Sequence, residues 1–484
     1  MQELGAFVLL PSLLAIVLAI WTRKVFVALI AGIWLGCYLL GGNPVSAIAD
    51  SIDRIVKVLA SAGDARVVLF TLCVGGLIAL IEVNGGVRAF VRWLEAKRWG
   101  QTRRQAQGLA WLSGVLIFIE SNITVLVAAT TAKPLFDRFK ISRAKLAYII
   151  DSTSAPICIL IPFNAWGAFN LGLLSGAGVE DPLTVFFQAV LLNFYAIFAV
   201  LLAALVIALD INWGPMKASE QRAQEAGVPD LEDSQSSINE RKPVESAESN
   251  AQGSLSDTLL MESVNESSAS STPLAMLLPV LTLILVMPLG LWITGDGDLR
   301  QGSGSTSVLW AVLAASTVAA SFMWRQQKSM ADAYFSGAGK MVPVALVLML
   351  ALALGAISRE LQAGDYLAQL LQGSMPTALV LPVVFLLASA VAFAIGSSWG
   401  TFSLLIPLAV PLAISMDLPL AALVAAVLSG GVFGDHASPI SDTTVISSMA
   451  AEVDHIEHVR TQLPYALLAA GVALIGFLFV GMFS

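Results

Sequence analysis

The polar stretch 434–448 interrupts a long apolar segment with two carboxylates, an imidazole, a proline and several hydroxyls. A lipid-facing helix cannot carry this stretch, because charge is costly in lipid and proline leaves backbone carbonyls without donors. A second stretch, 150–156, holds Asp151, three hydroxyl residues and a proline. Broken helices that line a polar cavity can hold both stretches, so we interpret them as two halves of an ion and substrate site in a secondary transporter.

Four carboxylates lie in apolar sequence beside predicted backbone breaks: Glu120, Asp151, Asp435 and Asp442. We predict that His436 is the only imidazole inside the membrane, whereas His455 and His458 lie in a solvated cytoplasmic loop. Further polar side chains surround the acids: Ser121, Asn122, Thr124, Ser152, Thr153, Ser154, Asn164, Ser397, Ser398, Thr401, Ser438, Ser441, Thr443 and Thr444. Hard cations prefer oxygen ligands, and these side chains, together with carbonyls freed at the breaks, can supply them to sodium.

The carboxylates are stronger candidates than the hydroxyls. A serine or threonine in a membrane helix commonly donates a hydrogen bond to a backbone carbonyl of its own helix or to a neighbouring helix, and has no role in binding. No basic residue is expected inside the membrane to neutralise the acids. Two buried carboxylates that share a site raise the proton affinity of one of them, so sodium and protons can compete for the same oxygens. His436 is then either a proton sensor or a neutral histidine that satisfies the carbonyls of the broken helix.

The composition predicts a polytopic membrane protein. The 484 residues are 57% hydrophobic and 12% charged, against about 25% charged in ordinary soluble domains. Mean hydropathy is +0.80. The sequence carries no Walker-type phosphate loop and no evident nucleophile–base pair, so we expect transport driven by an ion gradient rather than a motor or an enzyme. We expect no cofactor and no nucleic-acid partner.

Apolar segments recur along the whole chain, at 5–21, 25–41, 66–83, 107–131, 146–170, 185–209, 273–294, 307–324, 342–357, 377–414, 419–449 and 463–482. Each half has three uninterrupted segments, one long interrupted segment, one segment broken by proline and polar residues, and one closing segment. This match predicts internal repeats. The halves are joined by 210–272, which holds 12 acidic and 4 basic residues and has the composition of a disordered linker.

The distribution of Lys and Arg predicts the orientation. Both flanks of 107–131 are strongly basic, so both should be cytoplasmic. The segment is then a re-entrant hairpin with its tip near 120–124, and its counterpart 377–414 enters from outside with its tip at 396–401. The two halves are inverted on this reading, and five of the 26 basic residues lie outside: Arg54, Lys57, Arg66, Arg300 and Arg359. The alternative is that 107–131 crosses the membrane once.

Two motifs carry a resemblance to a known family. The segment 433–444, Phe-Gly-Asp-His-Ala-Ser-Pro-Ile-Ser-Asp-Thr-Thr, resembles the signature of NhaC-type sodium/proton antiporters, and 141–156 with Trp166-Gly167 resembles that family's first-half motif. The resemblance implies the ion-transporter-superfamily fold of inverted repeats, a homodimer and an elevator mechanism. It also implies Asp151 and Asp435 as sodium and proton ligands, with Asp442 close by.

The first hairpin tip departs from that family. The family carries a pair of acids where this chain has Glu120-Ser121-Asn122, and the tip is similar to the Ser-Asn-Thr tips of sodium/dicarboxylate carriers. The departure weakens pure cation exchange and favours co-transport of a small organic solute.

These observations predict an all-α polytopic protein of the bacterial inner membrane, with about ten crossings and two re-entrant hairpins. The scaffold comprises 1–106 and 273–376, and the transport unit comprises 107–209 and 377–484. The predicted function is sodium/proton antiport. The predicted ion and proton ligands are Glu120, Asn122, Asp151, Asp435, His436 and Asp442, with sodium at Asp151, Asp435 and Asn122. The alternative is Na+- or H+-coupled transport of an amino acid or small carboxylate, whose contacts are Asn122, Ser397, Ser398 and Thr401.

Overall fold

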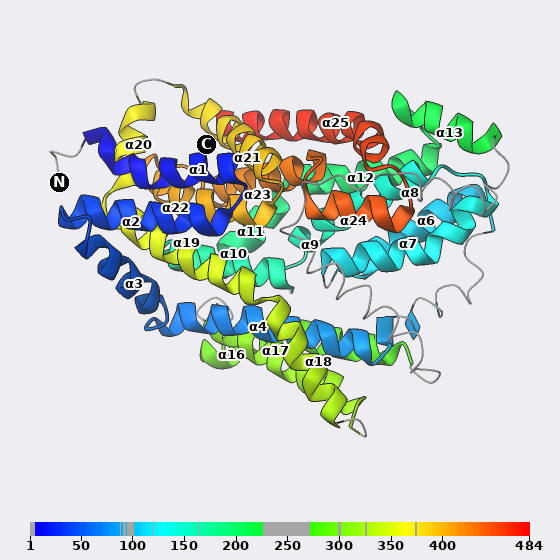
Figure 1. Ribbon diagram of the computed structural model, residues 1–484, viewed down its shortest axis with the longest axis horizontal. Coiled ribbons are helices and arrows are strands. Elements are labelled where there is room, and N and C mark those ends of the chain that lie inside the picture. The colour runs from blue at the N-terminus through cyan, green and yellow to red at the C-terminus, as the bar shows by residue number, and fades with distance from the viewer. Residues whose placement is uncertain are drawn as a thin grey trace.

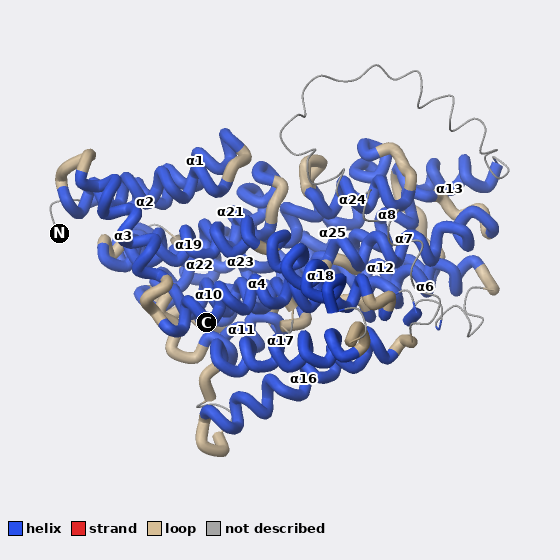
Figure 2. The backbone as a smooth tube through the Cα atoms, turned by 60° about the horizontal axis from the view of Figure 1, so that its bottom comes forward, coloured by secondary structure: helices blue, strands red, loops and turns tan. Residues whose placement is uncertain are grey.

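The computed structural model describes residues 5–87, 89–90, 93, 101–118, 120–162, 164–225, 272–298, 302–324, 327–372 and 375–484. Within these ranges every regular element is a helix (Figure 2). The predictions for most of the acidic linker, for Arg300 and for four basic residues before the first hairpin fall outside the described residues: Arg88, Arg92, Lys97 and Arg98.

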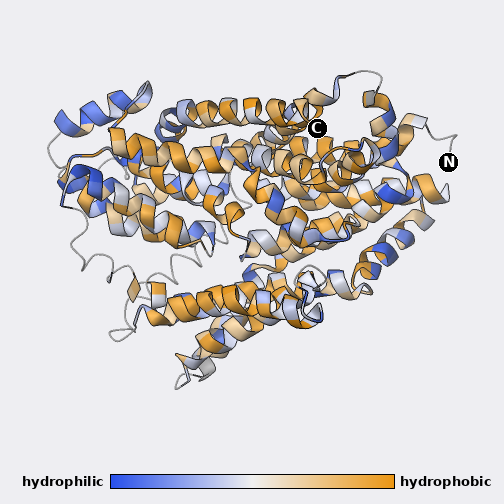
Figure 3. Ribbon diagram, turned by 180° about the vertical axis from the view of Figure 1, so that it is seen from behind, coloured by the Kyte–Doolittle hydropathy of each residue, from blue (hydrophilic) through white to orange (hydrophobic). Residues whose placement is uncertain are grey.

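Many of these helices are long and apolar. Among the described residues, nine could cross a membrane, and up to twelve spans result if each of three bent pairs counts as one. Hydrophobic residues run along most of the helices, while α3 and α13 carry hydrophilic patches (Figure 3). The predicted all-helical, multi-pass membrane class is confirmed.

The N-terminal part contains η1 (Gly5–Leu9), α1 (Leu10–Thr22), α2 (Val25–Gly41), α3 (Ser46–Val58) and α4 (Ala62–Val83). Helix α2 has the bounds that the apolar segment predicts. Helix α3 was not predicted, and its axis turns by 116° from that of α2. Its polar residues, including Asp50, Asp53 and Arg54, interrupt any apolar run, so hydropathy cannot find it.

The first predicted hairpin and broken helix follow, as α6 (Arg103–Leu116), α7 (Ser121–Arg138), α8 (Arg143–Ser152), α9 (Ala155–Leu160) and α10 (Ala165–Gly176). Helices α6 and α7 pack against each other, and they are connected between Leu116 and Ser121, so most of the predicted tip at 120–124 lies in the first turn of α7. Ser142 caps α8 and Asn164 caps α10 by accepting a hydrogen bond from the backbone N–H three residues on. The chain is therefore interrupted twice between α8 and α10.

The first half closes with α11 (Pro182–Leu191), α12 (Phe194–Leu209) and α13 (Pro215–Glu225). Helix α13 corrects the prediction that 210–272 is disordered throughout. Glu220 is buried, accepts a hydrogen bond from Ser142 N at 2.8 Å and pairs with Arg103. The start of the linker is thus fixed to the ends of α6 and α8, because a buried acid with these partners orders the surrounding chain.

The second half contains α16 (Leu274–Thr294), α17 (Gly304–Ser321), α18 (Gln327–Lys340), α19 (Val342–Glu360), α20 (Ala363–Gln372), η2 (Thr377–Leu379), α21 (Val380–Ile395), α22 (Ser398–Ser415), α23 (Leu420–Ala437), α24 (Asp442–Ala451) and α25 (His455–Met482). Helices α18 and α20 were not predicted. The second hairpin turns at Gly396, whose φ of 72° suits glycine.

The helices divide into recognisable groups. Helices α4, α16, α17 and α18 form a layer along one side, and α6, α7, α8 and α24 gather at the opposite end from α1–α3 (Figure 1). Helix α23 is central. Of its 18 residues 89% are buried, and it packs on α21, α22, α11, α12 and α25. A Cβ at Gly430 or Gly434 would meet carbonyl oxygens of α21, so these glycines permit the close approach.

Candidate functional site

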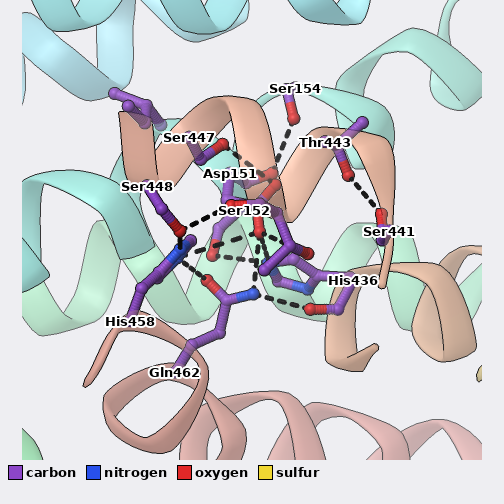
Figure 4. Close-up of polar contacts among 12 residues, drawn as sticks. Asp151, Ser152, Ser154, His436, Ser441, Thr443, Ser447, Ser448, His458 and Gln462 are labelled. Carbon is purple, nitrogen blue, oxygen red and sulfur yellow. Dashed lines mark hydrogen bonds and ion pairs between the residues drawn. The ribbon is translucent and has the colours of Figure 1, made fainter. Parts of the chain in front are cut away.

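Asp151 lies one residue before the end of α8 and is fully buried. Its Oδ2 accepts hydrogen bonds from Gln462 Nε2 at 2.8 Å and Thr444 Oγ1 at 3.4 Å, and its Oδ1 accepts one from Ser447 Oγ at 3.3 Å. These donors belong to α24 and α25, 293 to 311 residues further along the chain (Figure 4). The α8–α9 break and the C-terminal helices therefore share one polar cluster.

Two imidazoles complete the surroundings of Asp151. His436 Nε2 lies 3.8 Å from Asp151 Oδ2, and His458 Nε2 lies 3.9 Å from the same oxygen. Within the described part of the chain, no ion pair joins Asp151 to a lysine or arginine. A buried carboxylate without a permanent counter-charge is costly, so the cluster favours the arrival of a proton or a metal cation.

His436 connects the first acid to the second. Its Nδ1 lies 2.6 Å from Tyr195 OH, and its Nε2 lies 3.4 Å from Ser152 Oγ. Asp435, the preceding residue in the last turn of α23, is 4% exposed and accepts a hydrogen bond from Ser398 Oγ at 2.7 Å. Asp435 is thus the chain neighbour of a histidine whose ring lies 3.8 Å from Asp151 Oδ2.

The second hairpin tip contributes one side chain directly to this cluster. Ser398 bonds Asp435, whereas Ser397 accepts a hydrogen bond from Gly400 N and caps α22. Thr401 donates to the Ser397 carbonyl within the helix. Ser438 donates to the Phe393 carbonyl at 2.8 Å and fixes the α23–α24 break to α21. Ser397, Thr401 and Ser438 therefore support the backbone in this structure.

The first hairpin tip packs on the other end of α9. Asn164 Nδ2 donates to the Phe118 carbonyl at 3.0 Å and to the Cys158 carbonyl at 2.8 Å. The six residues of α9 span about 9 Å, so the tip lies a helix length away from Asp151. Ser121 Oγ donates to Glu120 Oε1 at 3.3 Å, and Thr124 donates to the carbonyls of residues 117 and 120.

Asn122 at this tip has an unusual environment. Its Oδ1 is buried without a hydrogen-bond partner among the described residues. Such an orphan acceptor is the exception in folded proteins and indicates a place for a donor or a cation. Asn122 and the half-buried Glu120 therefore make a second polar region, separate from the Asp151–Asp435 cluster.

The remaining predicted residues have local roles in this structure. Asp442 is exposed in the first turn of α24. Ser441 Oγ lies 3.1 Å from Thr443 Oγ1. Thr153 and Ser154 donate to carbonyls of the preceding turn. None of these five residues donates a hydrogen bond to the Asp151 carboxylate in the described structure.

The prediction that His455 and His458 lie in a solvated loop is wrong. Helix α25 begins at His455, and His458 is fully buried beside Asp151. Gln462, one turn further on, was not predicted as a site residue. The positions 455, 458 and 462 share one helical face, and this spacing is the signal that could have found them. Acidic and basic residues among them conceal it from a hydropathy scan.

Comparisons with known proteins place the chain among antiporters. The model of the Na+/H+ antiporter family matches residues 158–482. An uncharacterized protein of Haemophilus influenzae is 33% identical over 503 aligned positions, covering 98% of this chain and 90% of that protein. A malate-2H(+)/Na(+)-lactate antiporter of Bacillus subtilis is 36% identical over 110 residues, which is 21% of this chain and 24% of the antiporter. The YdaH transporter of Alcanivorax borkumensis has a similar fold, with a TM-score of 0.52 and 15% identity over 90% of this chain and 88% of the transporter.

Proposed function

The chain belongs to the Na+/H+ antiporter family, and on that premise we propose that it exchanges sodium for protons at Asp151 and Asp435. One observation carries the proposal: two buried acids flank His436, and their hydrogen-bond partners are neutral hydroxyls and an amide. Sodium or a proton can satisfy such an acid, but both cannot bind the same oxygen. Loading one cation therefore expels the other.

Transport also requires that the site face each side of the membrane in turn. We propose that 1–209 and 273–484 are inverted repeats and that the hairpins α6–α7 and α21–α22 enter from opposite sides. The segments 107–209 and 377–484 then move as one unit against a scaffold made by 1–106 and 273–376. The contact of Ser398 with Asp435 supports a unit that contains both hairpin and broken helix. The protein works as a homodimer in the bacterial inner membrane in this scheme.

Reconstitution into proteoliposomes tests the exchange. We expect sodium added outside to dissipate an imposed proton gradient with no organic solute present, because the two cations use the same carboxylates. Choline chloride at the same concentration controls for ionic strength. A proton gradient that persists in sodium at all pH values from 6 to 9, with correctly inserted protein, would falsify antiport.

The second candidate is Na+- or H+-coupled transport of an amino acid or small carboxylate. The unpartnered Oδ1 of Asn122 favours it, because this acceptor could bind a co-transported cation or the ammonium group of an amino acid at a tip that resembles those of sodium/dicarboxylate carriers. The Bacillus subtilis relative, named for malate and lactate, points in the same direction. In the same vesicles, ion movement that appears only after a carboxylate or an amino acid is supplied would select this candidate.

A further inference from the structure

The side-chain amide of Gln462 joins the two helix breaks. Its Nε2 lies 2.8 Å from Asp151 Oδ2 and 2.6 Å from the carbonyl oxygen of His436. These residues belong to α25, α8 and α23, and each is at most 2% exposed. Figure 4 shows the amide between the two groups. One buried side chain from α25 thus holds together oxygens from two other helices, α8 and α23.

The local sequence explains why the His436 carbonyl is available. Helix α23 ends at Ala437, and the residue three positions after His436 is Pro439, which has no N–H. The next N–H, that of Ile440, lies 3.3 Å from Ser438 Oγ. The carbonyl is therefore one of the acceptors that a helix C-terminus leaves open, and it takes its hydrogen bond from Gln462.

Hydrogen-bond chemistry fixes the orientation of the amide. A carboxylate and a carbonyl oxygen only accept, so Gln462 must present its NH2 group to them. Its Oε1 then lies 2.8 Å from His458 Nε2 and accepts a hydrogen bond from that nitrogen. The two ends of an amide have nearly the same shape, so a half-turn of the terminal group exchanges oxygen and nitrogen without other movement.

The same point suits a hard cation. Such ions bind oxygen ligands, and Asp151 Oδ2 and the His436 carbonyl oxygen already converge here, 2.8 and 2.6 Å from the amide nitrogen. Thr444 Oγ1, 3.4 Å from Asp151 Oδ2, brings another oxygen to this carboxylate. After a half-turn, Gln462 Oε1 takes the place of the nitrogen and faces these two acceptors; none of the three oxygens carries a hydrogen to donate, so a cation beside them would hold them together. Three oxygens from three helices, with a hydroxyl beside them, would then surround it.

We propose that Gln462 is a ligand of transported sodium and that its amide turns over when the ion binds. Gln462 Oε1, Asp151 Oδ2 and the His436 carbonyl then hold the cation, and the amide NH2 donates to His458 Nε2. His458 stays neutral but changes tautomer in this step: Nε2 gives up its hydrogen, and Nδ1, which faces Ser448 Oγ at 2.8 Å, gains one. Without the ion, the amide hydrogens keep the two site oxygens together. This inference rests on sodium being the transported ion.

Two substitutions at position 462 and one control test the assignment. Gln462→Met keeps the length of the side chain and removes its oxygen, whereas Gln462→Glu restores an oxygen at the same reach. Gln107 on α6 is also fully buried, and Gln107→Met is the matched control. Two quantities are measured for each variant. The first is the sodium concentration that gives half-maximal exchange. The second is the melting temperature in NaCl minus the melting temperature of the same variant in choline chloride.

We expect Gln462→Met to raise the half-saturating sodium concentration by about tenfold, the effect of about 1.4 kcal/mol of binding free energy. Gln462→Glu should stay within a few-fold of wild type, and Gln107→Met should be unchanged. A Met variant with wild-type sodium response overturns the assignment while leaving antiport intact. A Glu variant weaker than Met also overturns it, because it would show that position 462 acts only as a hydrogen-bond donor. If sodium neither raises the melting temperature of the wild-type protein nor causes proton exchange, the proposed antiport is wrong as well.

Discussion

Replacing Asp151 by asparagine removes a buried charge and leaves the surrounding hydrogen bonds in place. Gln462 and Thr444 donate to one carboxylate oxygen, and Ser447 donates to the other. In Asp151→Asn the amide oxygen can keep the first two bonds, and the Ser447 hydroxyl can turn to accept from the new NH2 group. The cost of burying a charge disappears. We therefore expect the melting temperature to rise or to fall by no more than about 4 °C.

We expect Asp151→Asn to reduce sodium/proton exchange far more than it changes the melting temperature. A unit charge about 4 Å from a monovalent cation contributes about 4 kcal/mol at an effective dielectric constant of about 20. Each 1.4 kcal/mol is a factor of about ten, so sodium affinity should fall by at least a hundredfold. The amide also cannot release a proton at neutral pH, so proton-coupled turnover should be lost together with sodium binding.

The assay is sodium-driven dissipation of a proton gradient in proteoliposomes, with thermal unfolding in detergent measured on the same preparation. Asp417→Asn is the matched control. Asp417 is exposed between α22 and α23 with a φ of 53°, which asparagine tolerates, so this variant should exchange normally. A folded Asp151→Asn protein with exchange within threefold of wild type would refute the role assigned to this acid.

Three further substitutions test other parts of the structure. Ser398→Ala removes the 2.7 Å hydrogen bond to Asp435, and because bonds to charged groups contribute about 1.5–3 kcal/mol, sodium half-saturation should rise by at least about tenfold in a transport titration. Gly434→Ala places a Cβ against the Ser389 carbonyl and should lower stability by about 1–3 kcal/mol, seen as earlier thermal unfolding; unchanged unfolding would contradict the packing of α23 on α21. The hydrogen bond from Lys133, aided by Arg143, holds the pKa of Glu452 below the ordinary glutamate value of 4.5. This lowered pKa stabilises the fold above pH 4.5, and the benefit disappears as pH falls through the folded-state value. Glu452→Gln should therefore unfold slightly earlier than wild type at pH 7, and the difference in melting temperature should shrink as the pH is lowered below 4.5.

The sequence predicts the breaks better than it predicts the helices around them. Charge and proline are rarely tolerated in an apolar run without a structural reason, so the interruptions at Asp151, Gly396 and Pro439 stand out. Short amphipathic helices such as α3, α18 and α20 have no comparable signal, because their polar residues resemble those of a loop.

The partners of Asp151 could not be predicted for a different reason. Thr444, Ser447 and Gln462 reach it only because α24 and α25 fold back onto α8, and no local pattern encodes that contact. The start of α25 also looks like a loop, since Asp454, Glu457 and Arg460 lie among the residues that face inward. Sequence identified both acids and His436, whereas the spacing of His458 and Gln462 marks only a helical face and does not show that this face reaches Asp151.

Both acids stand in the last turn of a helix, Asp151 in α8 and Asp435 in α23. The aligned peptide dipoles give each C-terminus about half a negative charge, so the acids add to a field that is already negative. A carboxylate arriving from solution meets repulsion from both helix ends until positive charge has entered. We therefore expect a fixed order of loading for any anionic cargo, with the cation first and the anion second, imposed by the direction in which two helices run.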